Sequence, residues 1–175
     1  MSCFINKKLS LVLLLLLINS YLFSQESSTD CIFDIKTQDD SFLKEIDELK
    51  NYKWDQKNKT ATIKISEKET IKIFRGGCND FLLKGEFIVS NNITFENNKG
   101  YILNKISWIS KLIFEKSDYI KIENCLKKNN ISINKSNPDK IHINLLNHEI
   151  YNSYTIFYNS ENEKFNTFSI EYFLN

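Results

Sequence analysis

Several residue types that build common functional sites are scarce in this chain. Its 175 residues include four glycines, one proline and two histidines, and Arg75 is the single arginine. A phosphate-binding loop needs a glycine-rich turn that enters a helix and carries Gly-Lys-Ser or Gly-Lys-Thr, and the sequence has no such run. It also has no nucleophile elbow, zinc-binding helix motif or dinucleotide fingerprint. The sequence therefore nominates no common enzyme class.

Metal and cofactor sites are not indicated either. Cys31, Cys78 and Cys125 follow each other at intervals of 47 residues, and His142 and His148 are six residues apart. Structural zinc sites use much closer pairs, such as Cys-X-X-Cys or His-X-X-X-His. We predict that the protein holds no metal and needs no cofactor.

Neither sign of charge is in surplus. The chain has 23 Lys and Arg against 22 Asp and Glu, and its formal net charge is +1. Nucleic-acid-binding proteins need a basic surplus on one face to neutralise phosphates, and polybasic segments hold proteins to anionic membrane surfaces. The balance predicts neither kind of partner.

The N-terminal region has the order of a secretory signal peptide. Lys7 and Lys8 form a positive head, residues 9–18 are almost wholly apolar, and small or polar residues follow. A retained membrane anchor is disfavoured, because a spanning helix needs about 20 apolar residues. We predict a signal peptide over 1–24 and a mature chain of residues 25–175, with 21 basic and 22 acidic side chains. That chain would be secreted or periplasmic and would not span a membrane.

Apolar periodicity predicts both strands and helices in the mature chain. Alternation with period two, as at Ile63 and Ile65, is typical of half-buried strands, and the spacing of Ile102 and Ile106 is typical of a helix. The predicted fold is a single α+β domain, in which an antiparallel sheet of about six strands carries three short helices on one face. We also expect a short strand over 31–35 and a bulge at Gly85. The main elements expected are a helix over 41–50, strands over 60–65, 71–76 and 81–90, helices over 101–115 and 117–129, and strands over 141–145, 154–158 and 168–172.

The most informative segment is residues 71–81, IKIFRGGCNDF, which holds two glycines, the arginine and a cysteine. Glycine adopts positive φ without a steric penalty, so we expect Gly76 and Gly77 to reverse the chain between two strands. Asp80 follows them and would repel an anion, which disfavours a phosphate cradle.

Cys78 has a structural and a catalytic interpretation. A nucleophilic thiolate needs a histidine or a cation beside it, and His142 is the candidate partner in a Cys78/His142 hydrolase. A hydrolase could instead use a pair of carboxylates, although no spacing in the sequence nominates such a pair. In an oxidising compartment a disulfide is favoured. Because Cys125 falls on the apolar face of its helix, we predict a Cys31–Cys78 disulfide, while the sequence leaves the other two pairings open.

Aromatic side chains are concentrated in the last 25 residues, where two alternating rows fit a core. Phe157 and Phe173 fall on the opposite face of their strands, where they would contact a protein or glycan of the cell envelope. If helices cover both faces of the sheet, these two residues are ordinary core.

Arg75, Asp80 and His142 are further candidates for a site, provided that the fold brings them together. The favoured function is a non-catalytic binding or inhibitor-like module, and a small secreted hydrolase and a structural envelope protein are the alternatives.

The chain also resembles a group of uncharacterised small secreted proteins of Bacteroidetes-type bacteria. The resemblance is carried by YKWDQKNKTATIKI followed by IKIFRGGCNDF, by ISWISKLI and by the ending FSIEYFLN. It spans most of the mature chain, and its sharpest motif is Gly-Gly-Cys at the end of a strand. Relatives often carry histidine at the position of Asp80, and this departure weakens any shared metal or acid–base role for the loop. The resemblance implies an exported protein and brings no activity with it.

Overall fold

The computed structural model describes residues 31–90, 93–137, 139–151, 153–162 and 164–174. The predicted signal peptide over 1–24, and the leader that would follow it up to residue 30, lie outside the described residues. Residues 32–175 form one compact unit. Within the described part of the chain, no helix is both long enough and apolar enough to cross a membrane.

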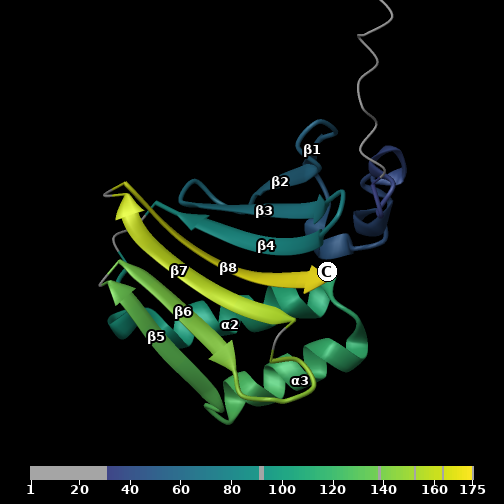
Figure 1. Ribbon diagram of the computed structural model, residues 1–175. Helices are drawn as coiled ribbons and strands as arrows, with labels where there is room; N and C mark the ends of the chain where they lie inside the picture. Colours follow the sequence, from purple (N-terminus) through teal and green to yellow (C-terminus); the bar gives the residue numbers. More distant parts are fainter. Residues whose placement is uncertain (1–30, 91–92, 138, 152, 163, 175) are drawn as a thin grey trace, which may run out of the picture. The chain divides into compact units, whose positions relative to one another are not determined.

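An eight-stranded antiparallel sheet is the centre of the fold (Figure 1). Its strands lie in the order β1-β2-β3-β4-β8-β7-β6-β5, so two four-stranded meanders meet where β4 pairs with β8. Two α-helices follow β4 and lead to β5. The elements are β1 (Lys53–Asp55), β2 (Thr60–Lys64), β3 (Glu69–Gly76), β4 (Phe81–Val89), α2 (Phe95–Ile113), α3 (Lys116–Lys127), β5 (Ile131–Asn137), β6 (Lys140–Leu145), β7 (Tyr154–Asn162) and β8 (Phe165–Leu174).

Strand register gives the sheet one buried face. Side chains alternate between the two faces along each strand, so residues aligned across neighbouring strands point to the same side. Both α-helices lie on that side, α2 across β4 and β8 and α3 beside β6 (Figure 1). Phe87 and Phe168 stack at its centre, with ring centroids 5.0 Å apart. One buried row consists of Ile71, Phe87, Phe168, Tyr158 and Ile141, and α2 packs against the sheet with Ile102, Ile106 and Ile109.

Gly85 lies in the buried face and makes room for α2. The predicted bulge at Gly85 is wrong, because the pairing of Gly85 with Ile73 on one side and Ile170 on the other continues the register without a shift. A Cβ atom on Gly85 would lie 2.7 Å from Cγ1 of Ile109. The missing side chain thus allows the helix to approach the sheet closely.

The N-terminal residues form turns in place of two predicted elements. Residues 31–35 do not form a strand, and the 3-10 turn η1 (Ile35–Thr37) begins there. The helix predicted over 41–50 is wrong as a continuous element: two 3-10 turns, η2 (Ser41–Leu43) and η3 (Asp47–Leu49), are separated by Ile46, whose backbone is extended. So short a segment gains little from helical propensity alone. Its apolar side chains still face the core, since Leu43 and Leu49 are fully buried.

The Gly76-Gly77 turn is held by a side chain from this N-terminal region. Gly77 has a φ of +152°, which favours glycine, whereas Gly76 is the last paired residue of β3. The side-chain amide of Gln38 donates a hydrogen bond to the carbonyl oxygen of Gly77 (2.7 Å) and accepts one from its N–H (3.1 Å). The glycine pair therefore ends a strand, as expected, and the polar groups of Gly77 are bonded to Gln38.

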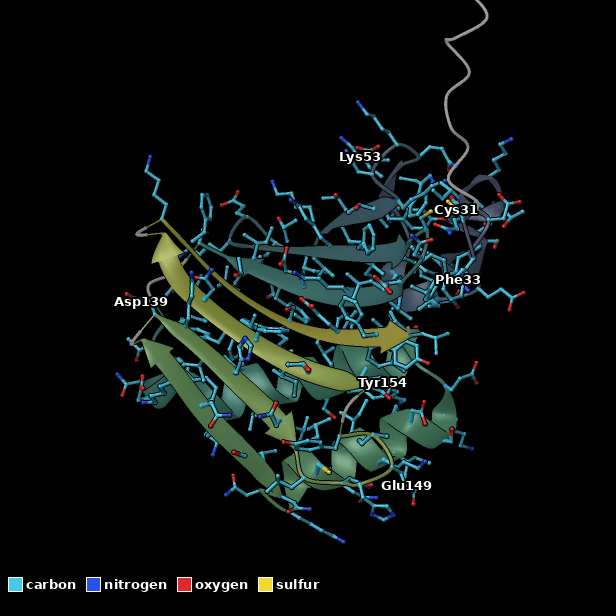
Figure 2. All side chains as sticks on the ribbon, in the orientation of Figure 1. Cys31, Phe33, Lys53, Asp139, Glu149 and Tyr154 are labelled. Atoms are coloured by element: carbon cyan, nitrogen blue, oxygen red, sulfur yellow. The ribbon has the colours of Figure 1, made fainter. Side chains whose placement is uncertain are left out.

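The cysteines agree with the predicted disulfide. Cys31 and Cys78 are both disulfide-bonded, and among the described residues Cys125 is the free cysteine, buried on α3. Burial raises the pKa of the Cys125 thiol, so this thiol behaves as a small apolar side chain. The main-chain N–H of Phe33, which is labelled in Figure 2, donates to the carbonyl oxygen of Cys78 at 2.9 Å. This hydrogen bond holds the segment beside the turn.

Both strands that the sequence did not predict are edges of the sheet. β1 has three residues, and β5 alternates isoleucine with serine, asparagine and lysine. Edge strands are commonly short or polar, because long apolar edges invite aggregation. The apolar periodicity of β1 and β5 is therefore too weak to predict a strand. The sheet accordingly has eight strands where about six were expected, within the predicted antiparallel α+β class.

Candidate functional site

The face of the sheet that neither α2 nor α3 covers holds a groove of about 390 Å³, which we call the open-face groove. It runs over the four central and C-terminal strands β4, β8, β7 and β6. Apart from Phe157, its lining consists mainly of polar and charged side chains from the positions that alternate with the buried rows. The side chains that line it include Lys84, Glu86, Lys140, His142, Phe157, Asn159, Thr167, Ser169 and Glu171.

A lysine between two glutamates forms the floor of the open-face groove. Nζ of Lys84 lies 2.7 Å from Oε1 of Glu86 and 3.1 Å from Oε1 of Glu171. The hydroxyl of Ser169, itself buried, donates to Glu171 at 3.3 Å. Burial lowers the pKa of Lys84, but the two carboxylates outweigh burial and raise it. Lys84 is therefore charged, and its two ion pairs hold it in place.

The same geometry speaks against a pair of catalytic carboxylates in the groove. A glycosidase places its two carboxyl groups on either side of the bond that it cleaves. Here the ammonium group of Lys84 bonds both Glu86 and Glu171, so it fills the space that the scissile bond or a water molecule would need.

An aromatic pair forms one wall of the groove. Phe157 on β7 lies opposite His142 on β6, and their rings meet edge to face with centroids 4.2 Å apart. His142 is exposed and Phe157 is half-buried. Phe173 lies on the same face near the end of β8, opposite Leu82, and is 46% exposed. Phe157 thus belongs to the groove, whereas Phe173 is not among the side chains that line it.

A second hollow, the Arg75 cleft, lies on the other face of the sheet. Arg75 follows Ile71 and Ile73 in the inward-facing row of β3, and the last turn of α2 borders the cleft with Leu112 and Ile113. The cleft has a volume of about 400 Å³. Most of its lining is aromatic or aliphatic, with charged groups at the start of α3: Phe42, Ile46, Arg75, Phe81, Leu83, Leu112, Ile113, Phe114, Glu115, Lys116, Asp118, Tyr154 and Tyr172.

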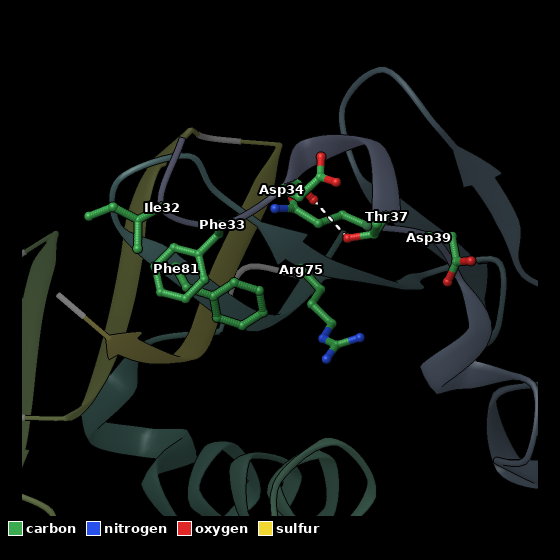
Figure 3. Close-up of a pocket in the computed structure, with 8 residues that line it drawn as sticks. Ile32, Phe33, Asp34, Thr37, Asp39, Arg75 and Phe81 are labelled. Carbon is green, nitrogen blue, oxygen red and sulfur yellow. Dashed lines mark hydrogen bonds between the residues drawn. The ribbon is translucent and has the colours of Figure 1, made fainter. Parts of the chain in front are cut away.

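Arg75 and Phe81 also border a smaller pocket of about 290 Å³ (Figure 3). Its polar rim comes from η1 and the residues on either side of it. Asp34 accepts a hydrogen bond from the backbone N–H of Lys36 at 2.9 Å, and its carbonyl oxygen accepts one from the hydroxyl of Thr37. Figure 3 shows the guanidinium of Arg75 extending away from Asp34.

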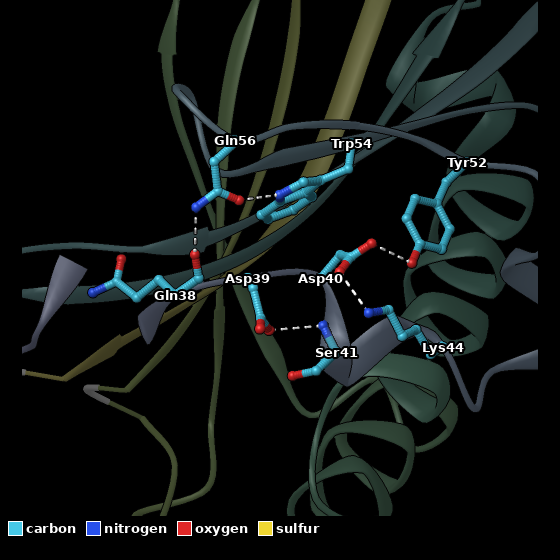
Figure 4. A network of polar contacts seen from close by, with 8 residues as sticks. All are labelled: Gln38, Asp39, Asp40, Ser41, Lys44, Tyr52, Trp54 and Gln56. Carbon is cyan, nitrogen blue, oxygen red and sulfur yellow. Dashed lines mark hydrogen bonds and ion pairs between the residues drawn. The ribbon is translucent and has the colours of Figure 1, made fainter. Parts of the chain in front are cut away.

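A polar network holds the turns that frame the Arg75 cleft (Figure 4). The hydroxyl of Tyr52 donates to Asp40 at 2.8 Å, and Lys44 pairs with the same carboxylate at 3.2 Å. The hydrogen bond from Tyr52 lowers the pKa of Asp40, and burial raises the pKa of Tyr52. Gln56 donates to the carbonyl oxygen of Gln38 at 3.2 Å and so ties the β1–β2 turn to the same segment. The network fixes η2, which carries Phe42.

The three loop-site candidates from the sequence do not converge. Arg75 lines the cleft on the buried face, His142 lines the groove on the open face, and Asp80 is exposed in the turn before β4 and lines neither. Cys78 is disulfide-bonded, so the Cys78/His142 pair lacks the thiolate that it would need. No group of histidine, cysteine, aspartate and glutamate among the described residues is arranged to hold a metal ion.

Sequence reasoning missed the charged floor of the groove. Lys84 and Glu86 alternate with buried residues in β4, and Glu171 does so in β8, which is a signal for one solvent-facing row. The sequence pattern could not reveal the register between β4 and β8, which places Lys84 opposite Glu171.

Comparisons with protein-family models, with curated proteins and with solved structures find no match.

Proposed function

We propose that this protein is an exported, non-catalytic binding module whose open-face groove binds a neutral glycan of the cell envelope. The observation that carries the proposal is the half-buried Phe157 beside a fixed set of polar side chains, on the face of the sheet opposite the α-helices. The disulfide bonding of Cys31 and Cys78 is compatible with export, because disulfides persist in oxidising compartments.

The groove offers both kinds of contact that a sugar ring needs. One face of a sugar presents C–H groups, which pack on an aromatic ring such as Phe157, and its hydroxyls both donate and accept hydrogen bonds. Glu86 and Glu171 present carboxylate oxygens to hydroxyl donors, and hydrogen bonds to charged groups are the stronger ones.

Charge on the groove favours a neutral ligand. Two lysines, Lys84 and Lys140, are matched by two glutamates, Glu86 and Glu171. A strongly charged ligand would meet repulsion from one of the two sets, whereas a neutral and hydroxyl-rich ligand meets none. The volume of about 390 Å³ is in the range of small-ligand sites.

An NMR titration of the purified exported protein tests the proposal. The probes are neutral tetrasaccharides of glucose, of xylose and of N-acetylglucosamine. We expect one of them to cause saturable shifts of backbone amides at His142, Phe157 and Ser169. Phe157→Ala should weaken that binding by about tenfold or more, which is the effect of losing one good aromatic contact.

Phe173→Ala is the matched control, since Phe173 lies on the same face outside the groove-lining set. It should leave sugar binding unchanged. Absence of saturable shifts with all three sugars, or an equal loss in both variants, would contradict the proposal and would favour a protein partner on this face.

A further inference from the structure

Arg75 is unusual among the charged side chains of this protein. It is the single arginine, it is half-buried and it points to the buried side of the sheet. Its guanidinium carbon lies 4.8 Å from the ring centre of Phe42 and 5.6 Å from that of Phe81. In the described part of the chain, its guanidinium takes part in no hydrogen bond and no ion pair.

The aromatic rings place the guanidinium without using its N–H groups. Stacking on aromatic faces stabilises a guanidinium through its π face and leaves its planar fork of five donors free. A carboxylate matches that fork with two parallel hydrogen bonds. Arg75 is therefore held ready for an anion in the cleft of about 400 Å³.

The acids around Arg75 are already engaged or lie apart from it. Asp118 accepts the hydroxyl of Tyr154 at 2.7 Å and lies 3.9 Å from Lys121. Asp39 accepts the backbone N–H of Ser41 at 2.9 Å. Hydrogen bonding to Ser41 and, to a smaller extent, the charge of Arg75 lower the pKa of Asp39, but Asp39 and Arg75 form no ion pair among the described residues. The side chains at the mouth, Glu115 and Lys116, are exposed, make no described hydrogen bond or ion pair and offset each other in charge. One positive group with free donors remains inside the cleft.

Apolar walls define the rest of the ligand. Phe42, Phe81 and Phe114 line the cleft with Leu83 and Ile113, and burial of apolar surface against such walls favours binding. We propose that the Arg75 cleft binds a monocarboxylate that carries an apolar or aromatic body. Such a carboxylate could belong to either of two ligands, a free small acid or the C-terminus of a peptide that ends in an apolar residue.

Calorimetry and NMR on the purified protein test this site with matched pairs of probes. One pair is 3-phenylpropionate and 3-phenylpropanamide, and the other is Ala-Ala-Ala-Phe as the free acid and as the C-terminal amide. We expect each acid that binds to bind at least about tenfold more tightly than its amide, since a charge-assisted bidentate contact is lost. Binding by both acids points to a chain terminus, and binding by phenylpropionate alone points to a small acid.

Arg75→Gln should reduce the affinity for the acid by at least about tenfold. Lys64→Gln removes the same charge from an exposed position on β2 and should leave binding unchanged. If Arg75→Gln does not fold, Arg75→Lys and the comparison of acid with amide on the parent protein decide the question. Equal affinity for acid and amide, or no saturable binding at about millimolar concentration, overturns the proposal.

This site is independent of the proposed glycan site. Arg75→Gln should not change oligosaccharide binding, and Phe157→Ala should not change carboxylate binding, because the two residues lie in different hollows on opposite faces of the sheet. Each proposal can thus fail while the other stands.

Discussion

Gly85 offers the sharpest test of how the sheet and α2 fit together. A Cβ atom at this position would lie 2.7 Å from Cγ1 of Ile109 and 3.1 Å from Cδ1 of Ile113. Ile109 is fully buried and packed between the helix and the sheet, so it has little room to move. Replacing glycine by alanine inside a strand normally stabilises by about 0.5–1 kcal/mol. Here overpacking costs about 1–3 kcal/mol, and we expect Gly85→Ala to be destabilising overall.

A double-mutant cycle separates this clash from other causes. Ile109→Ala removes Cγ1 and Cγ2, the two atoms of Ile109 that the new methyl group would meet, and by itself costs about 2–5 kcal/mol as a cavity. In the double variant the added methyl group fills part of that cavity. We expect its total cost to be lower than the sum of the two single costs by about 1 kcal/mol or more. The assay is urea unfolding followed by circular dichroism.

Gly100→Ala is the matched control, because a Cβ atom on Gly100 would meet nothing within 4 Å. At this exposed position on α2 the same substitution should stabilise by up to about 1 kcal/mol. If Gly85→Ala is as stable as the parent, or if the cycle is additive, then α2 does not approach the sheet as described.

Three further predictions concern pH, the turn and the disulfide. Burial and the hydrogen bond to Asp118 raise the pKa of Tyr154 above the value of about 10 in an unfolded chain. The folded state then keeps a proton that the unfolded state loses, so the stability that is present below about pH 10 falls as the pH rises further, by up to about 1.4 kcal/mol per pH unit. Urea melts across that pH should show a smaller fall for Tyr154→Phe and an unchanged fall for the exposed control Tyr151→Phe. Gly77→Ala should destabilise by at least about 2 kcal/mol, because the new Cβ atom would lie 1.7 Å from a backbone oxygen at positive φ; a urea midpoint equal to that of the parent would refute the described turn. Cys31→Ser opens a covalent loop and should cost about 4 kcal/mol by the chain-entropy model, measured as the difference in unfolding free energy without reductant.

Strong periodicity made the centre of the fold predictable. Ile71 and Ile73 alternate in β3, and Ile102 and Ile106 repeat at helical spacing in α2, because both elements bury one continuous apolar side. The elements that were missed or mistaken lack such a side. β1 is too short, β5 is polar at alternate positions as an edge strand, and residues 41–50 bury Leu43 and Leu49 through two separate turns.

The candidate sites were harder to predict, because each depends on contacts that are distant in sequence. Alternation in β4 identifies Lys84 as an outward-facing residue, but its position between Glu86 and Glu171 depends on the pairing of β4 with β8. Alternation in β3 likewise puts Arg75 in line with the buried Ile73. This alternation was visible in the sequence, and it indicates that the charge of Arg75 faces inward. The rings of Phe42 and Phe81 that contact its guanidinium come from η2 and β4, so their position beside Arg75 could not be predicted.

The coverage of the sheet explains why the two hollows differ in chemistry. The open face must be compatible with water, so its side chains are polar and pair across strands, as Lys84 and Glu171 do. On the buried face, α2 ends at Ile113 and Phe114 is already extended, so the Arg75 cleft lies at the end of this helix, with Leu112 and Ile113 in its lining. The turn η2 supplies Phe42 to the lining of that cleft. An arginine is compatible with the buried side only at such an end, where a ligand or solvent can reach its guanidinium.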